Sequence, residues 1–300
     1  PAVADASAIF DDFWNSSAAV PIEALNPQTP ENLHKLVVAL AHECTDATAQ
    51  VYLDRVAASP SAQRLANHEL SPHWIANITV ASDPPLKTKS ADRRDWLQPR
   101  LAAHLGGMHS EVLLISPYFV PGRQGTATLL GLVRGGSRVG VITNSLAAND
   151  VPAVHSGYER YRSQLLNGGV SLFEIRRHGL VATHGLFGSS GASLHTKAFV
   201  IDGARGFVGS FNLDPRSANL NTEMGVLFDD PGLAHDLRQE YLRLAMPELS
   251  YQLRRGANGS PQWLDRSVQP PAVLDHEPDA GWWLRTVTRA ISWLPIESQL

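Results

Sequence analysis

Hydrophobic residues in the middle of this 300-residue chain form short continuous runs separated by longer amphipathic stretches. Apolar runs of five or six residues suit strands buried on both faces, and apolar residues three or four apart suit helices. The predicted strands cover residues 75–80, 111–116, 138–143, 170–175, 196–201, 207–208 and 222–228. The predicted helices cover residues 96–104, 124–134, 155–166 and 233–246. This alternation predicts an α/β fold, a layered α-β-α sandwich whose mixed sheet carries helices on both faces.

The N-terminal part has a different pattern. Residues 5–16 and 31–58 carry helical apolar stripes, and residues 59–72 are a polar connection. The chain begins at Pro1 without a methionine, so we expect it to be a fragment. We expect residues 1–71 to be a helical remnant or linker that follows a missing first half, and residues 72–250 to be the main α/β domain.

The C-terminal part, residues 251–300, is predicted to be an extension. Residues 256–281 are rich in Gly, Pro and Asp and are predicted to be loop. A helix follows from Trp282, with Trp283, Leu284 and Val287 on its apolar face and arginines opposite. Two interpretations stay open: the apolar face packs on the domain, or the Trp-rich helix lies in a membrane interface.

Composition limits the classes of function. The apolar fraction of 43% predicts a sizeable core, and the net charge of −4 gives no support for nucleic-acid binding. No apolar run approaches the length of a membrane span. The single cysteine, Cys44, allows no internal disulfide and is expected to be buried and inert in a reducing compartment.

The candidate chemistry lies at His195 and Lys197. If this segment is a strand, both side chains point the same way, about 6 to 7 Å apart. Lysine is not a usual metal ligand at neutral pH, so the pair suits an anion: Lys197 offers charge to a phosphate, and His195 offers a nucleophile or a proton. Asp202 falls on the opposite face and in a turn, which favours a role in holding the fold.

Further polar residues follow at regular spacing. Ser210 and Asn212 add neutral donors for phosphate oxygens. Glu223, on the next predicted strand, is placed to orient His195 by accepting from its second ring nitrogen. The glycine-rich segment 185–191 is predicted to be a flexible connection near the mouth of the site.

This set resembles the phospholipase D superfamily, whose signature is His-x-Lys-x-x-x-x-Asp, then Gly-Ser-x-Asn and a later Glu. The resemblance implies that His195, Lys197, Asp202 and Glu223 are catalytic, and that Ser210 and Asn212 bind substrate. It also implies a sandwich of the phospholipase D type, with residues 72–250 as its catalytic domain.

The resemblance extends along residues 70–300. Segments 115–121, 143–150 and 154–158 are similar to segments of bacterial cardiolipin synthases, and the last two and the C-terminus are similar to the C-type branch. This similarity makes Tyr118 and His155 candidates for lining the substrate site, although a surface or capping role for His155 stays open.

The resemblance implies phosphodiester exchange without a metal or other cofactor. One histidine attacks phosphorus to form a phosphohistidine, and a second protonates the leaving alcohol and activates the acceptor. We expect His195 to be this acid/base, with the nucleophile role as the alternative. The implied substrate is a phospholipid and the implied location is the cytoplasmic face of the bacterial inner membrane, as a peripheral protein.

The chain departs from the family in having a single His-x-Lys. A two-histidine mechanism therefore needs a second motif, from a missing N-terminal half or from a homodimer partner. Two other functions stay open: a phosphodiesterase or nuclease on the same fold, which the acidic balance disfavours, and a non-catalytic half that binds lipid.

Overall fold

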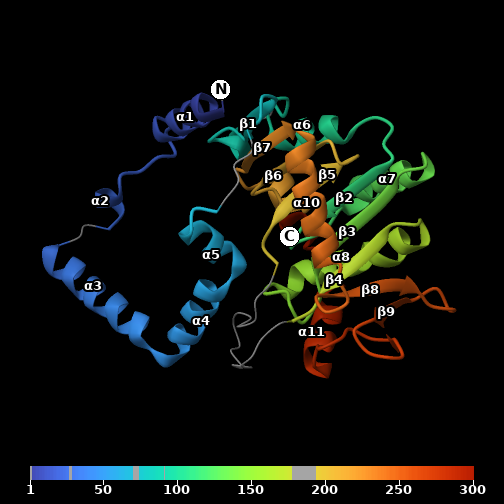
Figure 1. Ribbon diagram of the computed structural model, residues 1–300. Coiled ribbons are helices and arrows are strands. Elements are labelled where there is room, and N and C mark those ends of the chain that lie inside the picture. The colour runs from blue at the N-terminus through green and yellow to red at the C-terminus, as the bar shows by residue number, and fades with distance from the viewer. Residues whose placement is uncertain (1, 27–28, 70–73, 91, 178–193) are drawn as a thin grey trace. The chain divides into compact units, whose positions relative to one another are not determined.

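The computed structural model describes residues 2–26, 29–69, 74–90, 92–177 and 194–300 (Figure 1). The predicted glycine-rich connection at 185–191 lies outside the described residues. Internal contacts divide the chain into two units, Pro1–Phe13 with Ile75–Leu300, and Trp14–Trp74. The division into residues 1–71, 72–250 and 251–300 stays a prediction.

The smaller unit is helical. It contains α2 (Ile22–Leu25), α3 (Pro30–Thr45), α4 (Ala47–Ala58) and α5 (Pro60–Ala66). The single helix predicted over 31–58 is wrong because Asp46 is extended and separates α3 from α4. The predicted polar connection contains α5, which begins where the Ser59 hydroxyl accepts from the Ala62 amide at 3.3 Å. Cys44 is exposed, not buried, because α3 buries none of its residues.

The larger unit is built on one sheet, in which ten described strands follow the order β1-β7-β6-β5-β2-β3-β4-β8-β9-β10. Their bounds are β1 (Ile78–Ser82), β2 (Glu111–Ile115), β3 (Arg138–Asn144), β4 (Ser171–Ile175), β5 (Lys197–Ile201), β6 (Arg205–Gly209), β7 (Met224–Asp229), β8 (Ser250–Arg255), β9 (Pro261–Asp265) and β10 (Ala272–Leu274). Strands β2, β3 and β4 pair in parallel, and the other described pairs are antiparallel. The predicted mixed sheet is confirmed.

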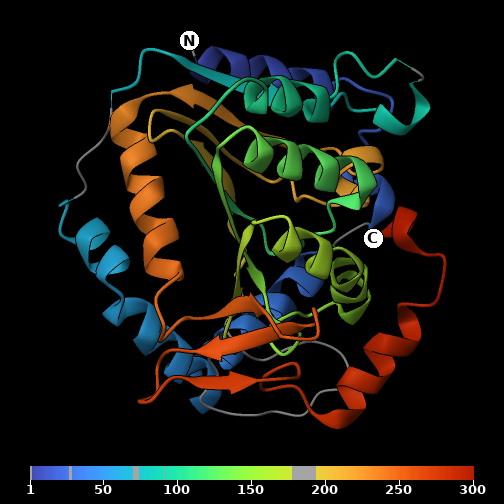
Figure 2. The ribbon, with the colours of Figure 1, turned by 90° about the vertical axis from the view of Figure 1, so that its right-hand side faces the viewer.

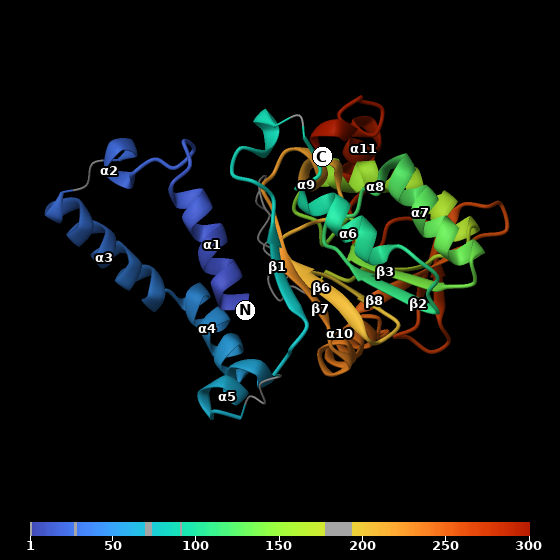
Figure 3. The same cartoon turned by 90° about the horizontal axis from the view of Figure 1, so that it is seen from above.

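Helices cover both faces of this sheet. On one face lie α6 (Leu97–Leu105), α7 (Gly122–Arg134) and α8 (Pro152–Asn167), and on the other lies α10 (Pro231–Leu244), as Figures 2 and 3 show. Neighbouring residues of β2 enter different cores: Leu114 packs with α6–α8 and Leu113 packs with α10. This alternation explains why all five residues of β2 are buried.

The C-terminal extension continues the sheet. Residues 256–281, predicted to be loop, contain β9 and β10, so that prediction is wrong. Arg176 at the end of β4 forms an ion pair with Asp265 of β9 and stacks on Tyr251 of β8, 3.8 Å from its ring centre. The chain closes with α11 (Trp282–Ile291) and the short helix η2 (Glu297–Gln299). The remaining described helices are α1 (Ala2–Trp14), η1 (Lys87–Lys89) and α9 (Pro215–Asn219).

Among the described residues, no helix combines the length and apolar character needed to cross a membrane.

Candidate active site

One edge of the sheet gathers the polar residues of the motif. Strands β2 and β3 end at this edge, and β5 and β7 begin there, because β5 runs antiparallel to β2 and β7 antiparallel to β6. The register pairs Lys197 with Gly209 and Gly209 with Gly225. Residues that precede β5 and β7 and residues that follow β6 are therefore neighbours in space.

Asn144, the last residue of β3, fixes the segment that carries His195. The side-chain Nδ2 of Asn144 donates to the backbone carbonyl of Leu194 at 3.2 Å, and its Oδ1 accepts from the backbone amide of Leu194 at 3.1 Å. His195 follows directly and is exposed. It lies before β5, which begins at Lys197 and not at residue 196 as predicted. His195 therefore lies just before β5, next to a residue held by Asn144, and its side chain is exposed to solvent.

Lys197 is the buried cation beside it, with 8% of the residue exposed. Its ammonium donates to the His195 carbonyl at 2.8 Å. Burial lowers the pKa of Lys197, and the carboxylates of Glu223, Asp214 and Asp150 oppose that shift. The three acidic groups thus favour the charged ammonium and partly offset its desolvation.

Glu223 is held differently from the prediction. Within the described residues its carboxylate accepts from the Ser210 hydroxyl, the Ser217 hydroxyl at 2.9 Å and the Asn221 amide at 3.2 Å. The expected contact with His195 is not among these bonds, because α9 brings Ser217 and the β6 end brings Ser210 directly against the carboxylate. In this arrangement Glu223 positions Ser210 and the α9 loop.

The segment after β6 is ordered by a helix cap. Asp214 accepts from the Ser217 amide at 2.6 Å and so caps α9. Burial raises the pKa of Asp214 to about 6, against the lowering effect of its bonds to Ser217. Asn212 lies two residues earlier, its backbone amide donating to the Ser217 hydroxyl at 3.3 Å. The Asn212 side chain is buried, and its Oδ1, which can only accept a hydrogen bond, has no partner among the described residues.

A buried ion pair supports this loop from behind. Lys87 donates to the Asp83 carboxylate and to the carbonyls of Ser217 and Asn221, each at 2.8 Å. Asp83 also accepts from the amide of Glu223 at 3.0 Å. Both charged side chains are fully buried. Asp83 and Lys87 are four positions apart, but the Ser217 and Asn221 carbonyls lie 130 and 134 positions from Lys87, so the role of the pair depends on the fold.

Tyr118 lies just beyond the end of β2. Its hydroxyl donates to Asp150 at 2.6 Å. Burial, then this bond, raises the pKa of Tyr118. Asp150 and Asp214 act electrostatically on both Tyr118 and Lys197.

Asp202 lies at the opposite edge of the sheet. It follows the last residue of β5, five positions from Lys197, or about 16 Å along an extended chain. Its Oδ1 accepts from the backbone amides of Ser110 and Glu111 at 2.7 and 2.8 Å, and from the Ser110 hydroxyl. Burial opposes these bonds, but together they lower the pKa of Asp202. These bonds support the structural role that the position of Asp202 on the strand had indicated, and the catalytic role implied for it stays a prediction.

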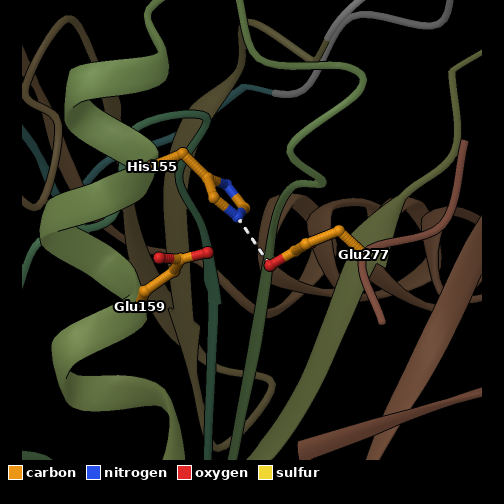
Figure 4. Close-up of side chains that lie close together, drawn as sticks. All are labelled: His155, Glu159 and Glu277. Carbon is orange, nitrogen blue, oxygen red and sulfur yellow. Dashed lines mark hydrogen bonds and ion pairs between the residues drawn. The ribbon is translucent and has the colours of Figure 1, made fainter. Parts of the chain in front are cut away.

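His155 also lies away from the exposed site. Its side chain is fully buried on α8 and its Nε2 is 3.3 Å from Glu277, with Glu159 alongside (Figure 4). Arg162 approaches both groups, at 2.8 Å from the Nε2 of His155 and 2.7 Å from Glu277. The expected substrate-lining position of His155 is not seen because α8 turns this face toward the C-terminal extension.

His155, Glu159 and Glu277 have the donor types of a metal site, and their ligand atoms lie within 4.8 Å of one another. Arg162 already supplies the cation there, since its guanidinium contacts two of the three. Burial raises the pKa of Glu277, but the charge of Arg162 outweighs it and holds that pKa well below its usual range. The cluster is therefore accounted for as a buried ion pair with its own counter-charge.

These features characterise an α/β protein with an exposed histidine, a buried lysine and a buried asparagine at one edge of a mixed sheet. The family model described as "Cardiolipin synthase, PLD-like domain" matches residues 101–245. The chain therefore contains a PLD-like domain of the kind found in cardiolipin synthases.

The relatives support this placement over nearly the whole chain. Cardiolipin synthase C of Escherichia coli K12 is 35% identical over 301 residues, covering 99% of this chain and 63% of that protein. Cardiolipin synthase B of Escherichia coli O6:H1 is 31% identical over 147 residues, covering 49% of this chain and 32% of that protein. This chain thus spans less than two thirds of the length of these relatives.

The fold has a solved counterpart. The phosphatidylserine synthase of Haemophilus influenzae superposes with a TM-score of 0.53 at 14% identity, covering 99% of this chain and 61% of that one. This similarity supports the fold.

Proposed function

We propose that this chain carries one half of the active site of a phosphatidyltransferase, which exchanges the alcohol of a phospholipid phosphodiester through a phosphohistidine. The observation that carries the proposal is the meeting of His195, Lys197 and Asn212 at one edge of the sheet. Each group has a use on a phosphodiester: a proton, a compact positive charge and a neutral donor.

The proposed sequence of steps uses two histidines. The first attacks phosphorus and the P–O bond to the leaving alcohol breaks, while His195 gives that oxygen its proton. His195 then takes the proton of the incoming alcohol, whose oxygen attacks phosphorus and releases the first histidine. His195 is the only histidine here followed two positions later by a lysine, so the first histidine comes from a further segment or from a second copy.

The proposal also covers the substrate and the location of the protein. A phospholipid substrate is implied by the family, and we place the protein peripherally on the cytoplasmic face of the bacterial inner membrane. Nucleic acid is a poor candidate substrate because the chain carries 29 acidic against 25 basic residues.

The test uses the intact gene product with vesicles that contain phosphatidylglycerol. We expect cardiolipin and glycerol as products, and a folded enzyme that leaves phosphatidylglycerol untouched would overturn the proposal. Alkaline quenching of a labelled reaction separates the two histidine roles. We expect the label on another histidine, still formed by His195→Gln, whereas a label on His195 itself would make it the nucleophile.

A further inference from the structure

Three exposed tryptophans lie on α11 or directly after it. Trp282 and Trp283 at the start of α11 are 70% and 64% exposed, and Trp293 just beyond its end is 83% exposed. Leu294 beside it is half exposed. The rings of Trp282 and Trp283 meet edge to face with centroids 5.7 Å apart. Tryptophan is enriched where one end of a side chain is in an apolar layer and the other in water.

The inner face of α11 is packed against the domain. Thr288 is buried, and Leu284, Val287 and Ile291 are partly buried where the helix packs on α8. The structure therefore combines the two interpretations left open by the sequence. One part of the apolar face packs on the domain, and the tryptophans stay outside it.

Hydrogen bonds and an ion pair tie the segment around Trp293 to α8. Arg160 of α8 donates to the carbonyls of Ser292 and Leu294, the latter at 2.9 Å, and pairs with Glu297 at 3.2 Å. Tyr161 donates to Glu297 as well. Trp293 therefore lies on a segment bonded to the domain, and Trp282 and Trp283 lie on the helix that packs on α8.

The same segment reaches the active-site loop. The backbone amide of Arg216 in α9 donates to the carbonyl of Leu300 at 2.6 Å, and η2 packs on α9 (Figure 2). Asp214, which acts electrostatically on Lys197, caps this same α9. A surface that engaged the tryptophans would thus hold α9 and the motif at a fixed distance from it.

Charge favours one kind of surface. Residues 280–296 contain Arg285 and Arg289 and no acidic residue, although the whole chain has a net charge of −4. Arg289 is exposed. A local cationic segment on an acidic protein is complementary to an anionic layer, and the pairing of arginines with interfacial tryptophans is typical of helices that lie in a membrane surface.

We infer that Trp282, Trp283, Trp293 and Leu294 form a membrane-docking surface that seats in an anionic phospholipid bilayer, with Arg285 and Arg289 toward the headgroups. The inference rests on the proposed function for the identity of its partner. Docking there presents the site to lipid in the bilayer, so the enzyme works on its substrate without extracting it far into water.

The test compares the intact gene product with the triple variant Trp282→Ser, Trp283→Ser, Trp293→Ser, and with Trp74→Ser as a control at a tryptophan that is 93% exposed. Sedimentation with phosphatidylcholine vesicles that contain a quarter phosphatidylglycerol measures binding. We expect the triple variant to bind at least tenfold more weakly, the control to bind as the wild type, and binding to weaken on phosphatidylcholine alone. Equal binding by the triple variant would overturn the inference, as would a change in oligomeric state without loss of vesicle binding, since the occupant would then be a second copy.

Two further measurements keep this test separate from the test of function. Brominated lipids should quench wild-type tryptophan fluorescence and quench the triple variant much less. Turnover of a short-chain, monomeric phosphodiester should be equal in the two proteins, whereas turnover on vesicles should fall with binding. Vesicle binding through the tryptophans without turnover of any phosphodiester would refute the proposed function and leave the docking surface standing.

Discussion

Asn144 and Leu194, fifty positions apart in the chain, exchange two hydrogen bonds at 3.1 and 3.2 Å. This pair ties the end of β3 to the residue before His195. A strand end from one part of the fold thus fixes the position of a reactive group in another, and the remaining side chains of the site are held in similar ways.

Loss of the two hydrogen bonds between Asn144 and Leu194 should lower turnover more than it lowers stability. We expect Asn144→Ala to lower kcat by roughly 10²-fold, the order expected when a reactive group moves by about 1 Å. The KM for phospholipid should change little, because Asn144 is buried and its side-chain amide is bonded to Leu194. Steady-state kinetics of the intact protein measure both, with Asn258→Ala in the β8–β9 turn as the control. An unchanged kcat in a folded Asn144→Ala would show that His195 does not depend on this bond.

The buried pair of Lys87 and Asp83 should carry much more stability than a surface pair of the same geometry. Lys87→Met leaves the Asp83 carboxylate buried and unpaired, which should cost about 3 to 5 kcal/mol of unfolding free energy. Lys35 pairs with Glu31 at the same 2.8 Å and the same spacing, but both side chains are mostly exposed. Lys35→Met should therefore cause no measurable change. Denaturant unfolding of the two variants gives the comparison, and equal losses would contradict it.

Asp202 should matter for stability and not for chemistry. Its φ of 53° suits glycine, so Asp202→Gly removes the carboxylate without straining the backbone. We expect a loss of about 1 kcal/mol in unfolding free energy, from the unmade bonds to Ser110 and Glu111. Since the pKa of Asp202 is lowered in the fold, this contribution is present above about pH 4 and is lost as the pH falls through the folded pKa. A large drop in kcat of the folded variant would support a catalytic role.

Asp214 should give the opposite pH dependence. Its pKa rises from 3.8 to about 6 on folding, so the folded protein holds the proton more tightly and stability falls as the pH rises from about 4 to 6. Two pKa units correspond to at most about 3 kcal/mol. Asp214→Asn keeps an acceptor for the Ser217 amide and should flatten this slope.

Unfolding free energies of the wild type and Asp214→Asn, measured between pH 4 and 7, give the difference directly. Asp230 caps α10 through the Leu233 amide at 2.8 Å in the same manner, so Asp230→Asn controls for the cap itself. A slope in the wild type that survives in Asp214→Asn would assign the pH dependence to other groups.

The reactive pair could be predicted from the sequence because His195 and Lys197 are neighbours on one segment, and a local pattern is enough to place them together. The strands around them were also predictable, since β2 and β3 are short runs rich in apolar residues. Asn144 and Lys87 could not be assigned, because the partner of Asn144 and the carbonyls bound by Lys87 lie 50 and 130 or more positions away and only the fold brings them together.

The errors have physical causes as well. The strands of the C-terminal extension are short and half polar, and Gly- and Pro-rich turns separate them, so pairing to β4 and β8 decides their structure. Cys44 was expected in a core because α3 has an apolar stripe, but that stripe stays exposed in the structure. His155 lies next to site segments in sequence, yet the direction of its side chain on α8 depends on Arg162 and Glu277.

The most direct test of the central claim is the rate of cardiolipin formation from phosphatidylglycerol by the intact protein and by His195→Gln. His235→Gln, at an exposed position on α10, serves as the control. Loss of a positioned acid/base should lower kcat by roughly 10² to 10⁴-fold without unfolding the protein, and the control should match the wild type. A folded His195→Gln that keeps turnover within a few-fold of the wild type would show that this edge of the sheet is not the active site.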